Sequence, residues 1–170
     1  MVSLRGAPIG DSGIEILLST PVLAPARHLG IEHCGLTDLG VEQVARSPQV
    51  KSLRELSLCN RGGIDTGPLN AIGDAGALAL AASPYLSQLE RLDLWNTGVG
   101  DRGLKAIITS PYLTQLSSVT AWGTRLSREG ASLLKALAQE QWERRKANQP
   151  GPVLCWIYTD YDERTITYEQ

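Results

Sequence analysis

Two tryptophans lie 27 residues apart, and each directly follows two apolar residues that are separated by one position. Trp95 follows Leu92-x-Leu94, and Trp122 follows the same pattern one unit later. Because alternate residues of a strand point to opposite faces, we expect both indoles on the face opposite the buried residues, about 5 Å apart on neighbouring strands. Tryptophan is among the residue types that most often carry binding energy at protein interfaces. The pair therefore predicts a binding surface.

Polar residues flank the tryptophans in neighbouring positions of the same pattern. An aromatic centre ringed by polar side chains has the composition of a protein-binding patch. We predict that a partner protein contacts Trp95, Trp122, Asp93, Asn96, Asn60, Arg91, Glu32 and His33. The alternative is that a C-terminal segment folds over both indoles, so that Trp156 and Tyr158 become their internal partners.

The residue types that serve catalysis form no recognisable motif. His28 and His33 lie five apart on what should be one strand, so we expect them on opposite faces, as solvated surface residues. No motif fixes a cysteine or serine beside either histidine as a nucleophile. Metal binding by His33 and Cys34 would need further ligands that the sequence does not place. We therefore expect no enzymatic activity, no metal and no cofactor.

The elements that position these residues repeat along the chain. Pro21, Pro48, Pro84 and Pro111 are separated by 27, 36 and 27 residues, so the middle unit carries nine extra residues. The apolar spacing recurs in each unit, and the start of the chain from Val2 also fits it. A unit of this size cannot close a core alone, so the pattern predicts about five units that stack on one another.

Residues 89–115 show what we expect of one unit. A strand with one buried face comes first, and Asp101 is predicted to be the N-cap of the following helix. Ser110-Pro111 is predicted to end that helix, because proline disfavours helical geometry in the residue before it. The same aspartate, with a glycine two residues later, recurs at Asp11, Asp38, Asp74, Gly13, Gly40, Gly76, Gly103 and, for glycine alone, Gly130. This recurrence predicts a packing role, in which a side chain would collide with a neighbouring layer.

The stretch 89–99, which reads Leu-x-x-Leu-x-Leu-x-x-Thr-x-Val, resembles the leucine-rich repeat. The 27-residue unit and the stretch 34–40 resemble the ribonuclease-inhibitor-like and cysteine-containing subclasses. The Ser-Pro-Tyr-Leu at 83–86 and 110–113 looks like the repeats of bacterial proteins. The resemblance covers roughly residues 1–138. It implies an α/β right-handed solenoid with a curved parallel sheet inside and helices outside, and a non-enzymatic scaffold that binds a partner protein on its concave face.

The insertion, residues 61–70, interrupts the turn after the strand that ends at Leu58. It should protrude as a loop beside the concave rim. Loops often carry recognition, so Ile64 and Asp65 join the predicted partner contacts. Its glycines and proline suit a surface excursion without function equally well, because closing a slightly longer loop costs little.

The C-terminal part departs from the repeat. No Ser-Pro follows the last unit, so we expect one extended helix from Arg128 to about Asn148 as a terminal cap. Val153–Thr159 and Arg164–Tyr168 read as two strands of a β-hairpin that covers the sheet edge. The expected organisation is a solenoid over 1–148 and a hairpin tail or cap over 149–170.

The N-terminal edge of the sheet has no comparable cap in the sequence. The alternative function is therefore a structural subunit or fragment of a larger array that docks through this edge, on further repeats or on a second copy.

Composition narrows the class of protein. The 170 residues carry a formal net charge of −2 with no basic stripe, which argues against nucleic acid as a partner. No apolar run approaches the roughly 18 residues of a membrane helix, and the start lacks the pattern of a signal peptide, so we expect a cytoplasmic protein. The three cysteines have no paired spacing, which disfavours a disulfide framework and a zinc site.

Overall fold

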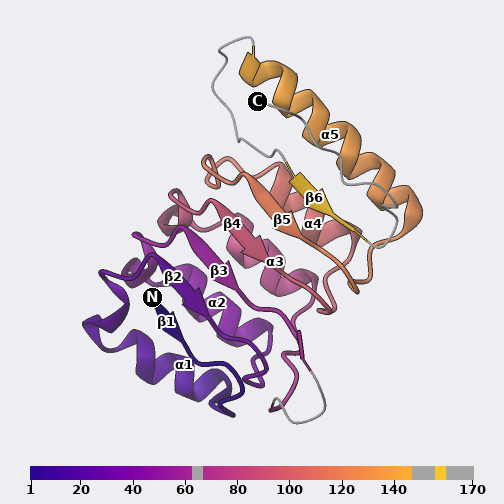
Figure 1. Ribbon diagram of the computed structural model, residues 1–170. Coiled ribbons are helices and arrows are strands. Elements are labelled where there is room, and N and C mark those ends of the chain that lie inside the picture. The colour runs from indigo at the N-terminus through magenta and orange to yellow at the C-terminus, as the bar shows by residue number, and fades with distance from the viewer. Residues whose placement is uncertain (63–66, 147–155, 160–170) are drawn as a thin grey trace.

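Strands and helices alternate along the chain in the computed structural model, which describes residues 1–62, 67–146 and 156–159 (Figure 1). The elements are β1 (Val2–Ser3), α1 (Gly10–Leu18), η1 (Pro21–Leu23), β2 (His28–Gly30), α2 (Asp38–Arg46), η2 (Pro48–Val50), β3 (Glu55–Ser57), α3 (Asp74–Ala81), η3 (Pro84–Leu86), β4 (Arg91–Asp93), α4 (Asp101–Ile108), β5 (Ser118–Thr120), α5 (Arg128–Lys146) and β6 (Trp156–Tyr158). The η elements are single turns of 3-10 helix that open at the repeated prolines.

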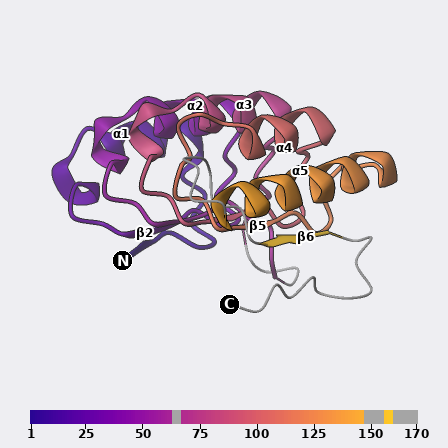
Figure 2. The same cartoon turned by 90° about the horizontal axis from the view of Figure 1, so that it is seen from above.

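The six strands of the described residues belong to one parallel sheet, in the order in which they occur along the chain. The register aligns Leu29, Leu56, Leu92 and Val119, so the equivalent apolar residues of successive units stand side by side. Helices α1 to α4 lie together on one side of the strands (Figure 2). We call the opposite side of the sheet the concave face. The predicted α/β solenoid is confirmed.

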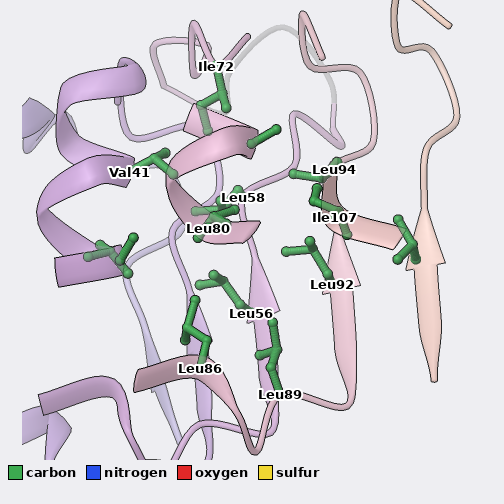
Figure 3. Close-up of a cluster of buried hydrophobic side chains, with 14 of the residues drawn as sticks. Val41, Leu56, Leu58, Ile72, Leu80, Leu86, Leu89, Leu92, Leu94 and Ile107 are labelled. Atoms are coloured by element: carbon green, nitrogen blue, oxygen red, sulfur yellow. The ribbon is translucent and has the colours of Figure 1, made fainter. Parts of the chain in front are cut away.

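The core fills the space between the sheet and the helices. In the central units Leu56, Leu92 and Leu94 point from their strands toward the helices, where Leu80 and Ile107 meet them (Figure 3). All five side chains are at most 1% exposed. Burying a side chain of this size contributes about 1.5–3 kcal/mol, so the stacked apolar columns hold the units in register.

The prediction that each aspartate caps its own helix is wrong. The N-cap position lies one residue earlier, and Asp38, Asp74 and Asp101 are the first residues of α2, α3 and α4. From there each carboxylate reaches the start of the next helix along the chain. Asp74 Oδ1 accepts hydrogen bonds from the N–H groups of Gly100 (2.7 Å) and Gly103 (3.0 Å). Each aspartate therefore connects two units.

The recurrent glycines make room for these aspartates. A Cβ added at Gly103 would lie 2.7 Å from Asp74 Oδ1 and 2.8 Å from the Ala77 Cβ, and one at Gly76 would lie 2.8 Å from Asp38 Oδ1. The predicted packing role is confirmed. The collision, however, is with the carboxylate of the preceding unit as well as with packed side chains.

The serines of the Ser-Pro pairs connect units at the other end of the helices. Ser83 Oγ donates to the Ala45 carbonyl (2.5 Å) and accepts from the Tyr85 N–H (3.3 Å). Ser110 Oγ donates in the same way to the Ala81 carbonyl (2.5 Å). These carbonyls belong to the last turn of the preceding helix, whose C=O groups have no partner within that helix.

The two edges of the sheet differ. Strand β6 pairs in parallel with β5 and covers that edge, as predicted for the first strand of the C-terminal hairpin. The predicted second strand, Arg164–Tyr168, lies outside the described residues, as do the residues just beyond Lys146 into which the last helix was predicted to run. At the opposite edge, β1 pairs with β2 alone among the described strands.

Candidate functional site on the concave face

The two tryptophans lie side by side on the concave face. Their ring centroids are 6.1 Å apart and their planes meet at 22°, which is a stacked arrangement. Trp95 is 36% exposed and Trp122 is partly exposed. The prediction that both indoles emerge from neighbouring strands is confirmed. The register pairs Asp93 of β4 with Thr120 of β5, and each tryptophan lies two residues further on, so the two are neighbours.

Arg61 completes the aromatic stack, although the sequence placed this residue only in the insertion. Its guanidinium carbon lies 4.1 Å from the centroid of the Trp95 ring, within the range of a cation–π interaction. The same guanidinium lies 3.5 Å from Asp93 Oδ2, and the Arg5 guanidinium donates to the Arg61 carbonyl (3.1 Å). Insertion and tryptophan pair therefore form one composite site.

Asp93 lies beneath this stack. Its Oδ1 accepts a hydrogen bond from the Trp95 N–H at 3.0 Å. Burial raises the pKa of the Asp93 carboxyl, while the Trp95 N–H and the charge of Arg61 act against that rise. The carboxylate therefore connects the Trp95 backbone to the guanidinium of Arg61, which lies over the Trp95 ring.

Charged side chains of the concave face are paired with one another. Arg5 lies 3.5 Å from Glu32, and Glu55 Oε2 contacts both His28 Nδ1 (3.1 Å) and Arg91 Nη2 (2.8 Å). The hydrogen bond from Arg91 is the main cause that lowers the pKa of Glu55. These charges are already compensated within the face, so the exposed indole of Trp95 and the partly exposed one of Trp122 are its uncharged contact surface.

Two residues predicted to project from this face are buried. Asn60 is 5% exposed, and its side chain donates to the Asn70 and Asn96 carbonyls, both at 2.9 Å. His33 is 2% exposed and has a left-handed backbone, with φ of 53°. Strand β2 ends at Gly30, so the alternation that placed His33 on a strand stops before it. Asn96, with φ of 55°, is exposed as predicted.

The insertion is one residue shorter than predicted, because Asn70 belongs to the repeat. Asn70 is 3% exposed; its Oδ1 accepts from the N–H groups of Cys34 and Leu36 (both 3.0 Å), and its amide donates to the Ile31 and Leu58 carbonyls. It takes the place that Cys34 takes one unit earlier. The extra residues are therefore 61–69, and Ile64 and Asp65 lie outside the described residues.

The insertion leaves and returns close to the first two units. The Gly35 N–H donates to the Pro68 carbonyl at 3.0 Å. Gly67 has φ of +90°, and a Cβ there would lie 2.6 Å from the Gly6 carbonyl oxygen and 2.7 Å from that of His33, so this position requires glycine. Both ends of the insertion are thus anchored at the rim of the concave face.

Strand β6 extends the sheet instead of crossing the indoles. Its register pairs Thr120 with Tyr158, so the described part of the C-terminal segment continues the plane of β5. Residues 160–170 lie outside the described part. The backbone of β6 does not test the alternative prediction, in which Trp156, Tyr158 and the C-terminal segment cover the indoles, so that alternative stays a prediction.

The described residues form neither an activated nucleophile nor a metal site. Burial raises the pKa of the Cys34 and Cys59 thiols, which keeps both in the neutral form. Cys34 Sγ donates to the Leu4 carbonyl at 2.8 Å, as expected for a residue that satisfies backbone groups in the turn. In the part of the chain that the structure describes, no three His, Cys, Asp or Glu side chains gather in a way that would hold a metal ion.

The fold, the repeated turn residues and the sequence now agree on a class. Residues 69–81 and 86–107 match the family model for the Leucine Rich repeat. No curated protein matches the chain. In the described residues no helix combines the length and the apolar character needed to cross a membrane. The fold is that of a leucine-rich-repeat solenoid, and repeats of this kind generally serve as protein–protein interaction modules.

Proposed function

We propose that this chain is a non-enzymatic, cytoplasmic binding module that holds a partner protein on its concave face and on the rim formed by the insertion. The observation that carries the proposal is the stack of Arg61, Trp95 and Trp122, which stands exposed on a face whose charges are otherwise paired. Aromatic residues and arginine dominate the energetics of protein interfaces.

The rigidity of the site supports the same proposal. Asp93 orients Arg61 and Trp95 at once, and the parallel sheet fixes Trp122 beside them. A receptor surface that is already ordered loses little side-chain entropy on binding, which favours affinity. We further propose that the repeats belong to the ribonuclease-inhibitor-like and cysteine-containing subclasses, which the 27-residue unit and the Cys34 turn support.

The test replaces both indoles and compares the result with an equivalent loss of aromatic surface elsewhere. Trp95→Ala with Trp122→Ala should weaken binding of a partner, isolated with the wild-type chain and then purified, by at least a hundredfold in calorimetry. Tyr85→Ala with Tyr112→Ala is the matched control, because these residues are 37% and 44% exposed, 27 apart, and lie in the turns that precede β4 and β5. Equal binding by both double variants would contradict the proposal.

The edge of β1 that no other described strand pairs with supports a second candidate function, a structural subunit that docks through this edge onto further repeats or a second copy. Large apolar side chains are exposed at the same end of the solenoid, with Met1 at 89% and Ile16 at 69%. Sedimentation velocity over a hundredfold range of concentration tests self-association. A monomer at every concentration would exclude docking of two copies through β1.

A further inference from the structure

A second site lies away from the concave face, at the start of strands β2 to β4. A pocket of about 390 Å³ opens there, and its lining is mainly polar. The lining residues are Pro25, Arg27, Lys51, Ser52, Arg54 and Gln88, which come from three successive units. The site shares no residue with the composite site around Arg61, so it does not depend on the proposed function.

The backbone brings two of the arginines together. The N–H groups of Arg54 and Glu55 both donate to the Arg27 carbonyl, at 2.8 and 3.0 Å. Arg27 and Arg54 therefore stand at equivalent positions of adjacent strands, which lie about 4.8 Å apart. Like charges in such positions repel each other, so an oxyanion between them would relieve a cost that the folded chain otherwise carries.

The charges of the pocket are only partly compensated. Glu90, at the equivalent position one unit further on, forms an ion pair with Arg54. Arg27 and Lys51 are exposed, and neither forms an ion pair with a carboxylate of the described residues. Three cations and one carboxylate leave two positive charges at this site. The concave face differs, since its arginines each contact a carboxylate.

We propose that this pocket binds a phosphate group. The guanidinium of Arg27 offers paired N–H donors that match the oxygens of a phosphate, and Lys51 adds a point charge. Ser52, in the same unit as Lys51, and Gln88, one unit further on, supply neutral hydrogen-bond donors. A dianionic phosphate monoester matches the two uncompensated charges. A small phosphorylated metabolite and a phosphorylated side chain share this chemistry.

Calorimetric titration of the full chain at low salt and pH 7.5 tests the proposal with three ligands: inorganic phosphate, glycerol 3-phosphate and a short peptide with one phosphoserine. All three should bind to the wild-type protein. Arg27→Gln with Lys51→Gln should weaken binding at least tenfold. Lowering the pH from 7.5 to 5 should weaken it as well, because a phosphate monoester has its second pKa near about 6 and loses one charge.

The matched control removes two exposed cations from another surface. Arg102→Gln with Lys105→Gln, both on α4, should change the affinity less than twofold. Circular dichroism confirms that both double variants are folded. Tighter binding of the phosphopeptide than of glycerol 3-phosphate would identify a phosphorylated side chain as the natural ligand, and the reverse order a metabolite. Absence of binding by all three ligands, or equal binding to both double variants, would overturn the proposal.

The concave indoles provide an independent check. The variant with Trp95→Ala and Trp122→Ala should bind phosphate with unchanged affinity, since no residue is shared between the sites. Failure of the partner-binding proposal would therefore leave this result unaffected, and loss of phosphate binding in that variant would count against a separate site.

Discussion

The recurrent aspartate has two roles: one at the outer junctions, α1–α2 and α4–α5, and another at the inner junctions, α2–α3 and α3–α4. Where α1 meets α2, the Asp11 carboxylate accepts from Thr37 N–H (2.9 Å) and from its hydroxyl (2.6 Å), while Thr37 Oγ1 caps its own helix by accepting from the Leu39 N–H (3.2 Å). The α4–α5 junction repeats this with Asp101 and Ser127.

The inner junctions have no such side chain, because their N-cap residues are glycines. Asp38 Oδ1 accepts from both Gly73 N–H (2.7 Å) and Gly76 N–H (2.9 Å), and Asp74 does the same one unit later. The second of these amides is the one that an N-cap side chain ordinarily satisfies. At the inner junctions one carboxylate therefore both starts a helix and joins two units, whereas at the outer ones these tasks are divided.

This difference predicts its largest effect at an inner aspartate. Asp74→Ala leaves two amides without their acceptor and should lower the free energy of unfolding by about 3 kcal/mol. Urea denaturation followed by circular dichroism measures it. Asp74→Asn is the control, because its side-chain oxygen can still accept these hydrogen bonds. It should lose less than half of the free energy of unfolding that Asp74→Ala loses. Equal loss in both variants would show that charge matters more than capping.

A methyl group at the glycine that faces this aspartate should cost slightly less. Gly103→Ala places a Cβ 2.7 Å from Asp74 Oδ1, so we expect a loss of about 2 kcal/mol from overpacking. Arg102→Ala, one residue earlier and exposed, should stay within about 0.5 kcal/mol of the wild type. A gain in stability from Gly103→Ala, as helix propensity alone predicts, would contradict the tight contact.

The outer junction should tolerate loss of its aspartate better. In Asp11→Ala the Thr37 hydroxyl still caps α2, so we expect a loss of only about 1.5 kcal/mol, measured by the same urea transition. If Asp11→Ala were as damaging as Asp74→Ala, the division of tasks between Asp11 and Thr37 would have no energetic meaning.

A rescue experiment makes the comparison sharper. Gly100 has φ of −112° and room for a Cβ, whose nearest contact would be 3.5 Å, so serine fits there. Gly100→Ser added to Asp74→Ala should restore about 1 kcal/mol, because the serine supplies the cap that the helix lacks. The same substitution in the wild-type chain should have a smaller effect. No restoration would mean that Asp74 stabilises the junction without capping α4.

The sequence predicts most of the fold, because the 27-residue spacing fixes the register of successive units. That register also predicts the adjacent indoles: residues that follow paired strands at the same offset must be neighbours. The repeat pattern does not predict contacts between residues at different positions of neighbouring units. The reach of Asp74 to Gly100 depends on how far apart two helix starts lie in space.

The prediction of the site from the sequence is wrong for two physical reasons. The strands end after two or three residues, and the chain turns through a left-handed position at Gly6, His33, Asn96 and Gly123. Glycine, asparagine and histidine tolerate this conformation, so the residue types at these equivalent positions were the available signal. Arg61 was missed as a partner of Trp95 because the insertion removes it from the repeat frame, and Asn70 takes the place it leaves.

The aspartate bridges give the solenoid a direction. Each one accepts from the unit that follows it, so a finished coil offers a fixed acceptor to the chain that emerges next during synthesis on the ribosome. Growth from the N-terminus then proceeds by templated addition, with the cost of starting each new helix lowered by its predecessor. In a permuted chain that began at α3, this helix would be synthesised before Asp38. It would then have to form without the acceptor that Asp38 provides for its first amides.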